Sequence, residues 1–387
     1  MNDTHSGVKP PYRKRGGVAT IAVALVAALP MIALAPVAKS SDAADSTRIR
    51  FFVSGHSLTD NPYANYIAAV LTSKKYTVDW NQQIVIGSPT KVRTMGMDDQ
   101  GKWGGYSKGK DRHGRSDVRV LEEFAPAAPK PYTHLILTEG NELLLNLINN
   151  DTLRFTRHFH EKLVAHNGAG QTLIFQPWEI VKDSAKPQDW IALEKSASRV
   201  WACLANRINL SIEREGRQDR VGVLPAGHAL ADLLEAAMNK QIAPWSNLTA
   251  PQLVKRLFSD NVHITGIGKY YLALVSAAVM TKKDPSGAWA PSFLDKEIAS
   301  ALQNRAWEFV QKNVLGKPLP AMAQCRAHMA NMFCKQWNDY AAEYLVRIGQ
   351  CKSMYSKEVF VNNYNEGPNP FLLPTKEQDA SYWFAPN

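Results

Sequence analysis

Cysteine is scarce in this chain of 387 residues, and the spacing of the few cysteines excludes a common class of metal site. The four are Cys203, Cys325, Cys334 and Cys351, and no two of them form a Cys-x-x-Cys pair. Their spacings do not match those of a zinc finger. An even number of cysteines instead suits two disulfides in an oxidising compartment, with three connectivities open.

The sequence also lacks internal repeats and any nucleic-acid-binding motif. Lys and Arg number 45 against 35 Asp and Glu, which gives a formal net charge of +10, but the basic residues are scattered along the chain. Nucleic-acid-binding proteins gather such residues in a patch or a motif. We therefore expect no nucleic-acid partner, whereas a basic surface facing acidic glycans or anionic lipids remains compatible. The hydrophobic content of 45% is that of a packed globular chain.

The only long apolar run lies near the amino terminus. Four basic residues between positions 9 and 15 precede the uncharged residues 16–38, and a polar run of small residues follows. This order is that of an export signal, and we expect cleavage between Ala38 and Ala44. An uncleaved membrane anchor is the alternative, since about 20 apolar residues can span a bilayer. Either way, the chain beyond this 1–44 segment is exported to the periplasm or the cell exterior, and membrane contact is limited to the segment.

Short apolar runs then alternate with amphipathic segments, which is typical of strands that cross over through helices into a parallel sheet. The pattern predicts a three-layer α/β/α sandwich over residues 45–315. The expected strands are 48–54, 76–80, 134–138, 172–176 and 220–225, and the expected helices are 62–74, 141–149, 151–166, 187–215, 228–238, 250–258, 264–281 and 293–313.

Two segments depart from this alternation. Residues 95–117 are rich in glycine and charge, and a loop of this length is either disordered or functional. Trp103 and Tyr106 lie within it; they could stack on a sugar or pack back on the domain. Residues 316–387 form a second departure, a helical extension with three of the four cysteines, in which runs near 321–336 and 337–350 suggest a disulfide-tied hairpin.

Polar residues follow the predicted strands at the positions where ligands bind in open parallel sheets. Gly55-His56-Ser57 follows the first strand, Gly87 comes after the second, Glu139-Gly140-Asn141-Glu142 follows the third, and Asp260-Asn261-Val262-His263 precedes a late helix. Each block has a structural interpretation as well: Gly55 suits a tight turn, and Ser57 could cap a helix. Trp178 follows the fourth strand, and we expect it to line the pocket or to pack in the core.

These residue types fit acyl transfer. A serine hydroxyl needs a base, an imidazole supplies one near neutral pH, and a carboxylate three residues before the imidazole can fix its tautomer. The amides of Ser57 and Gly87 and the side chain of Asn141 could bind an oxyanion. No metal is implied: His158 and His160 lie two residues apart on an expected helix and so face different sides.

The four blocks resemble those of the SGNH hydrolase superfamily, also called GDSL-type esterases, over residues 48 to about 281. The resemblance implies a flavodoxin-like fold, with Ser57 as nucleophile, His263 as general base, Asp260 as its partner, and Ser57, Gly87 and Asn141 as oxyanion donors. The chain departs from the family at His56, where aspartate is usual, and around Glu139 and Glu142. His56, Glu139, Trp178, Trp103 and Tyr106 are the substrate-binding candidates.

The resemblance implies a serine esterase that needs no cofactor and cleaves a small acyl group, such as acetyl. The export segment, the aromatic and basic loop and the habit of exported family members together suggest that the acyl group comes from a carbohydrate. Two alternatives stay open at this stage. The same site could transfer the acyl group to a hydroxyl of an envelope polysaccharide, or the chain could be a non-catalytic glycan-binding module.

Overall fold

The computed structural model describes residues 47–96, 102–116, 118–128, 130–341, 348–356 and 369–384. The predicted export segment and its cleavage region lie outside the described residues. Within the part of the chain that is described, no helix has the length and apolar character needed to cross a membrane.

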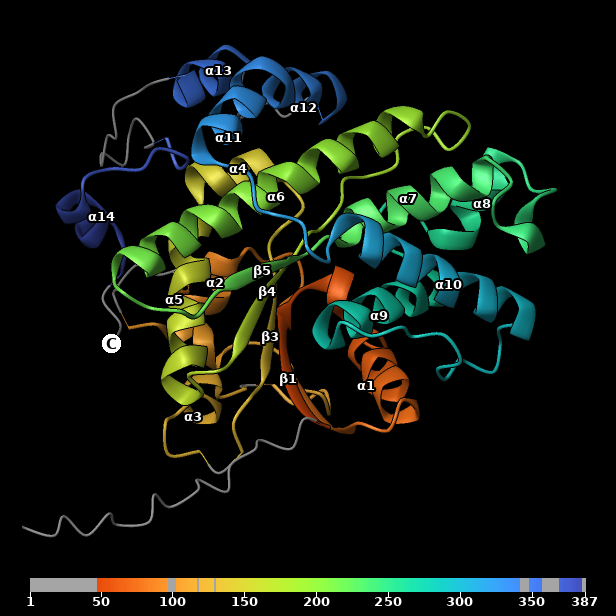
Figure 1. Ribbon diagram of the computed structural model, residues 1–387, viewed down its shortest axis with the longest axis horizontal. Coiled ribbons are helices and arrows are strands. Elements are labelled where there is room, and N and C mark those ends of the chain that lie inside the picture. Colours follow the sequence, from red (N-terminus) through yellow and green to blue (C-terminus); the bar gives the residue numbers. More distant parts are fainter. Residues whose placement is uncertain are drawn as a thin grey trace, which may run out of the picture. The chain divides into compact units, whose positions relative to one another are not determined.

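The centre of the fold is a five-stranded sheet in which every strand pairing is parallel, in the order β2-β1-β3-β4-β5 (Figure 1). The first strand, β1, lies between β2 on one side and β3 on the other, and β4 and β5 follow beyond β3. The order therefore reverses between β1 and β3, the place where open α/β sheets bind ligands. The strands are β1 Arg48–Gly55, β2 Thr77–Ile84, β3 His134–Thr138, β4 Gln171–Phe175 and β5 Val221–Leu224.

Successive residues of β1 explain why the sheet is covered on both faces. Phe51 and Val53 enter one apolar cluster, whereas Phe52, between them, enters another, and all three are fully buried. Side chains alternate between the faces of a strand, so a run of consecutive apolar residues requires a helical layer on each side.

One helical layer consists mainly of α1, α7, α9 and α10, which share a core cluster with Phe51 and Val53. The other consists of α4, α5 and α6, which pack on the opposite face (Figure 1). The predicted three-layer α/β/α sandwich is thus confirmed. The bounds are α1 Tyr63–Ser73, α4 Leu143–Asn149, α5 Thr152–His166, α6 Gln188–Arg214, α7 Ala226–Met238, α8 Ala250–Leu257, α9 Gly266–Thr281 and α10 Lys296–Asn313.

Short helical segments complete the domain between these long elements. They are η1 Ser57–Thr59, α2 Thr90–Thr94, η2 Gly104–Ser107, α3 Val120–Glu123 and η3 Ala243–Trp245. The described part of the 95–117 segment is packed and not free, because Tyr106 is fully buried and Lys110 bridges to Ile84 at the end of β2.

The carboxyl-terminal segment packs on α6. Its helices are α11 Met322–His328, the π-helical turn η4 Met329–Phe333, α12 Cys334–Ala341, α13 Ile348–Ser356 and α14 Lys376–Tyr382. Met329, Phe333 and Trp337 share one apolar cluster with Trp201 and Leu204 of α6. The extension therefore completes the core of the main domain instead of forming a core of its own.

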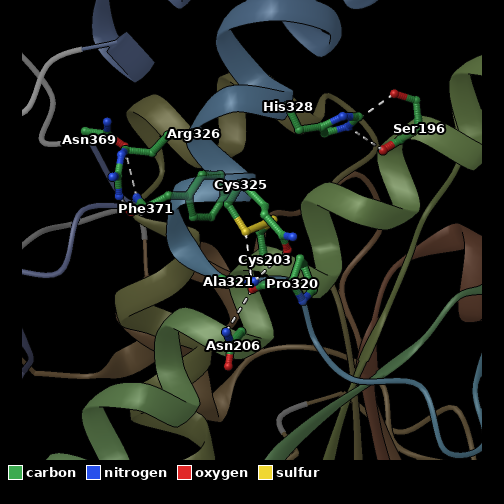
Figure 2. Close-up of a disulfide and its surroundings, with 11 residues drawn as sticks. Ser196, Cys203, Asn206, Pro320, Ala321, Cys325, Arg326, His328, Asn369 and Phe371 are labelled. Atoms are coloured by element: carbon green, nitrogen blue, oxygen red, sulfur yellow. Dashed lines mark hydrogen bonds between the residues drawn. A yellow bond between two sulfur atoms is a disulfide. The ribbon is translucent and has the colours of Figure 1, made fainter.

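Two disulfides hold this segment in place. Cys203–Cys325 joins α6 to α11, and Cys334–Cys351 joins α12 to α13. Figure 2 shows the first of them, with Asn206 of α6 donating to the Pro320 carbonyl at 2.9 Å nearby. The sequence leaves the connectivity open. It predicts a disulfide-tied pair of helices at 321–336 and 337–350, but α11, η4 and α12 follow one another without a break from Met322 to Ala341, and the second disulfide joins α12 to the later helix α13. Two disulfides fit an exported protein, since such bonds persist in oxidising compartments.

Candidate active site

Ser57 is the first residue of η1, directly beyond the carboxyl end of β1. The tight turn depends on Gly55: a Cβ added there would lie 1.9 Å from Oγ1 of Thr59. Gly55 itself has no positive φ, so the chain needs glycine here because space is lacking and not because the backbone angle is unusual. The turn brings the hydroxyl of Ser57 to the edge of the sheet at which the strand order reverses.

A hydrogen-bonded relay links Ser57 to His263 and Asp260. Oγ of Ser57 lies 3.2 Å from Nε2 of His263, and Nδ1 of His263 lies 2.7 Å from Oδ2 of Asp260. An aspartate that accepts the Nδ1 proton leaves the lone pair of Nε2 directed at the serine hydroxyl. The structure therefore brings three residues from two distant segments into the arrangement that a serine nucleophile requires.

Asp260 is fixed by its own loop. Its Oδ1 accepts hydrogen bonds from the backbone amides of Val262 at 2.7 Å and His263 at 2.6 Å. These amides, that of His263 first, lower the pKa of Asp260 to about 2. The carboxylate thus stays ionised throughout the pH range in which an imidazole acts as a base.

The loop that carries His263 is held from behind by the segment that follows β4. Nε1 of Trp178 donates to the Val262 carbonyl at 2.7 Å, and the amide of Val181 donates to the Asn261 carbonyl at 2.7 Å. Trp178 is only 1% exposed, so it supports the catalytic loop from within the core. The prediction that Trp178 lines the pocket is wrong, because its ring is packed and its one donor is already satisfied.

A pocket of about 160 Å³ opens beside Ser57 and His263. Gly87 and Asn141, the other two expected oxyanion donors, line it. Gly87 has a φ of +65°, a left-handed conformation that favours glycine. Within the described residues, neither the Gly87 amide nor the Asn141 side chain makes a hydrogen bond to the protein, so both donors are available to a ligand. The full lining set is His56, Ser57, Leu58, Gly87, Pro89, Gly140, Asn141, Glu142, Asn146, Asn150, Val262 and His263.

His56 lines the same pocket as a neutral side chain. Its Nε2 donates to the Glu139 carbonyl at 2.8 Å, and the side chain is almost fully buried. Burial, and then the positive charge of Arg93, lower the pKa of His56 to about 4. At neutral pH His56 is therefore uncharged, and it does not repel a protonated His263 during a reaction.

A buried carboxylate, which the sequence did not indicate as structural, joins two loops of the pocket. The carboxylate of Glu139 accepts the amides of Thr90 and Gly140, both at 2.8 Å, and the Thr152 hydroxyl at 2.9 Å. Thr90 follows the Gly87 turn, and Gly140 precedes Asn141, so this one carboxylate joins the two loops that carry the oxyanion donors. Glu139 itself does not line the pocket, and its predicted contact with substrate is replaced by this bracing role.

Arg93 is a buried cation whose positive charge interacts with the carboxylate of Glu139. The side chain is fully buried, and its guanidinium donates to Oγ of Ser54 at 3.1 Å, to both oxygens of Ser88 and to the Thr138 carbonyl. These bonds tie the ends of β1 and β3 to the Gly87 turn. Burial lowers the pKa of Arg93 to about 10, while the charge of Glu139 opposes the shift. Arg93 thus remains charged, and Glu139 balances its charge.

Two further predicted substrate contacts pack against α5 or within the core: Tyr106 is a core residue, and Trp103 is partly buried against the same cluster. Tyr106 is fully buried, and its hydroxyl lies 2.8 Å from Nδ1 of His158. Trp103 stacks on the same imidazole, with ring centroids 3.6 Å apart. Neither aromatic residue lines the pocket. The prediction of sugar stacking is wrong for Tyr106, because no part of its ring reaches the surface, and Trp103 is engaged in packing on α5.

Among the described residues, no group of three His, Cys, Asp or Glu side chains could hold a metal ion.

Comparisons with known proteins give little for this chain. No protein-family model matches it, and no curated protein matches its sequence. Among solved structures, that of a DUF4886 family protein from Bacteroides uniformis is similar to 68% of this chain and 95% of that chain, with a TM-score of 0.45 and 10% sequence identity. The functional argument therefore rests on the geometry of the site.

Proposed function

We propose that the protein is an exported serine ester hydrolase of the SGNH type that removes a small acyl group through an acyl-enzyme. The observation that carries the proposal is the relay of Ser57, His263 and Asp260, with its 3.2 Å and 2.7 Å contacts, at the mouth of a small pocket. In this geometry the hydroxyl has its base and the base has its orienting carboxylate.

The reaction starts when His263 takes the proton of Ser57 as Oγ attacks the ester carbonyl. The resulting oxyanion is stabilised by the amides of Ser57 and Gly87 and the side chain of Asn141, each such donor contributing about 2.7–4 kcal/mol in comparable sites. His263 then donates the proton to the leaving alcohol, which departs and leaves the acyl group on Ser57. A water molecule then attacks the acyl carbonyl as His263 takes its proton. The bond to Oγ of Ser57 breaks, the acid leaves, and His263 returns the proton to Ser57.

The exposure of the site favours hydrolysis over transfer to a second alcohol. The side chains of His263 and Asp260 are 46% and 52% exposed, so water reaches the base directly. A transferase must keep water away from its acyl-enzyme, whereas the exposed side chains of His263 and Asp260 leave this site open to water. The small pocket also favours a short acyl group such as acetyl. Placement in the periplasm or outside the cell is part of the proposal and follows from the predicted export signal.

Labelling with a fluorophosphonate probe tests the nucleophile. The probe reacts covalently with an activated serine, so we expect the wild-type protein to be labelled and Ser57→Ala to remain unlabelled. Labelling that persists in Ser57→Ala would reject Ser57 as the nucleophile. Absence of labelling in both proteins, with both correctly folded, would favour a non-catalytic binding module.

A further inference from the structure

One wall of the pocket consists of polar side chains from α4 and the residues that flank it. Glu142 precedes the helix, Asn146 lies within it and Asn150 follows it, and all three line the pocket. They are spaced by four residues, which places them on one side of a helix. Nδ2 of Asn150 donates to Oδ1 of Asn146 at 2.7 Å, so the two amides form a continuous polar row. We call Glu142, Asn146 and Asn150 the α4 row.

Asn146 is held in place in this row with one donor to spare. The residue is only 3% exposed, and a Cβ added to Gly140 would lie 2.8 Å from its Nδ2, so the glycine makes room for the amide. Its Oδ1 is occupied by Asn150, whereas its Nδ2 has no hydrogen-bond partner within the described residues. Because Asn146 lines the pocket, this donor is open to it, and a ligand oxygen there can accept its hydrogen bond in place of water.

The chemistry of the lining limits what the ligand can be. Asn amides donate and accept, and the Glu142 carboxylate accepts, so the α4 row matches groups that do both, above all hydroxyls. The lining contains Glu142 but no Lys or Arg, which disfavours an anionic ligand such as a uronate or a phosphate headgroup. Leu58, Pro89 and Val262 give a smaller apolar part suited to a methyl group.

We propose that the α4 row binds the hydroxyl groups of the alcohol half of the ester, so that the substrate is an acetylated neutral sugar. This inference rests on the esterase function proposed above and assigns the residues that select the alcohol. It also narrows the glycan class: the basic overall charge of the chain suggested acidic glycans, whereas the pocket itself favours an uncharged one.

The kinetic test compares two acetyl esters, an acetylated neutral monosaccharide and 4-nitrophenyl acetate, which has no hydroxyls. The readout is the ratio of their kcat/KM values. We expect Asn146→Ala and Asn150→Ala each to lower the ratio for the sugar over the nitrophenyl ester by about ten-fold, the effect of losing a hydrogen bond between neutral groups. Asn149→Ala is the matched control, because Asn149 lies on the exposed side of the same helix, and it should leave both rates unchanged.

Asn146 is more deeply buried, so Asn146→Ala could unfold the protein. Asn150→Ala then still tests the proposal, because Asn150 is only half-buried. Thermal unfolding of each variant separates lost folding from lost selectivity. A ratio that stays at the wild-type value in a folded Asn150→Ala protein would overturn the proposal.

Binding to Ser57→Ala separates the inference from the esterase proposal, because no turnover is needed. By calorimetry, the acetylated monosaccharide should bind Ser57→Ala and bind Ser57→Ala/Asn150→Ala about ten-fold more weakly. No sugar binding to Ser57→Ala, while the wild type hydrolyses nitrophenyl acetate, would overturn the inference and leave the esterase intact. Sugar binding that depends on Asn150, without fluorophosphonate labelling of the wild type, would support the α4 row and reject the esterase.

Discussion

Glu139 follows a strand in a loop, where an acidic side chain is usually exposed, but here it is buried and links two loops. It is 2% exposed, and its carboxylate joins the Thr90 and Gly140 amides beside a fully buried Arg93. A glutamine retains the shape and one oxygen that can accept both amides, but it removes the charge that balances Arg93. Buried charges without a partner are costly, by about 3–5 kcal/mol. The two loops are therefore expected to shift when the charge is removed.

We predict that Glu139→Gln lowers kcat for nitrophenyl acetate by ten-fold or more, with a smaller change in KM, because the oxyanion donors bind the transition state more strongly than the ester. Steady-state kinetics together with thermal unfolding measure the effect. Asp379→Asn is the matched control: Asp379 is a buried carboxylate that pairs with the fully buried Arg207 at 2.6 Å, but it joins α6 to α14. It should lose stability and keep kcat; an equal loss of kcat in both variants would contradict the bracing role.

At the scale of elements, the segment between β4 and α6 links a buried acid to the catalytic loop. Glu194 of α6 is 1% exposed and accepts the Glu179 amide at 2.8 Å and the Gln176 side chain at 3.1 Å. Burial without a cationic partner raises the pKa of Glu194 to about 8. The same segment contains Trp178 and Val181, which hold the His263 loop. The protonated carboxyl thus helps to fix the support of the catalytic base.

This raised pKa predicts a loss of stability as the pH rises from about 4.5 to about 8. The folded protein keeps the Glu194 proton up to about pH 8, whereas the unfolded chain releases it near 4.5, so the free energy of unfolding falls as pH rises toward 8. Between pH 7 and pH 9 we expect a fall of about 1–2 kcal/mol that Glu194→Gln lacks. Urea denaturation of both proteins at the two pH values measures the difference, and parallel losses in both would count against the assignment.

The elements show which features a sequence can reveal. The five strands and the long helices follow from apolar runs and helical periodicity, and all except β2 lie within a few residues of their predicted bounds. β2 extends beyond the expected 76–80 to Ile84, because the polar Gln83 is buried by hydrogen bonds to Ser54 and to the carbonyls of Arg93, Gly105 and Lys108. Such long-range partners leave no periodic trace in the sequence.

The same reasoning applies to the site. Ser57, Gly87, Asn141, Asp260 and His263 could be found because each follows a strand or precedes a helix in a recognisable block. The sequence does not show how exposed an aromatic residue is, and the predicted substrate contacts therefore include Trp178 and Tyr106, which lie in the core. The α4 row did leave a signal in the sequence LLLNLINN: Asn146 interrupts the apolar run of the helix, and Asn150 follows it four residues later, just after the helix ends.

At the scale of the whole molecule, the carboxyl-terminal helices are connected to the catalytic loop. The Tyr340 hydroxyl of α12 donates to the Ile180 carbonyl at 2.7 Å and accepts the Lys182 amide at 3.2 Å. Between these two residues, the Val181 amide donates to the carbonyl of Asn261, which is two residues before His263. We therefore expect the disulfide that anchors the extension to α6, Cys203–Cys325, to support the surroundings of the base as well.

The two disulfides are expected to contribute unequally. Cys203–Cys325 spans 122 residues and anchors α11 to the sheet domain through α6, whereas Cys334–Cys351 spans 17 residues within the extension. The loss of unfolded-state entropy grows with the length of the closed loop, which gives about 5 kcal/mol for the first bond and about 3 kcal/mol for the second. We predict that Cys203→Ala/Cys325→Ala lowers the free energy of unfolding more than Cys334→Ala/Cys351→Ala.

Denaturant unfolding of the two double variants compares these bonds directly, since each pair replaces two buried cysteines with the same residue. Because the longer link attaches the helices that contact the 180–182 segment, its loss should also increase hydrogen exchange in the loop that holds His263, whereas loss of the shorter link should affect mainly α12 and α13. Equal destabilisation, with no change in exchange near His263, would mean that the extension covers α6 without supporting the site.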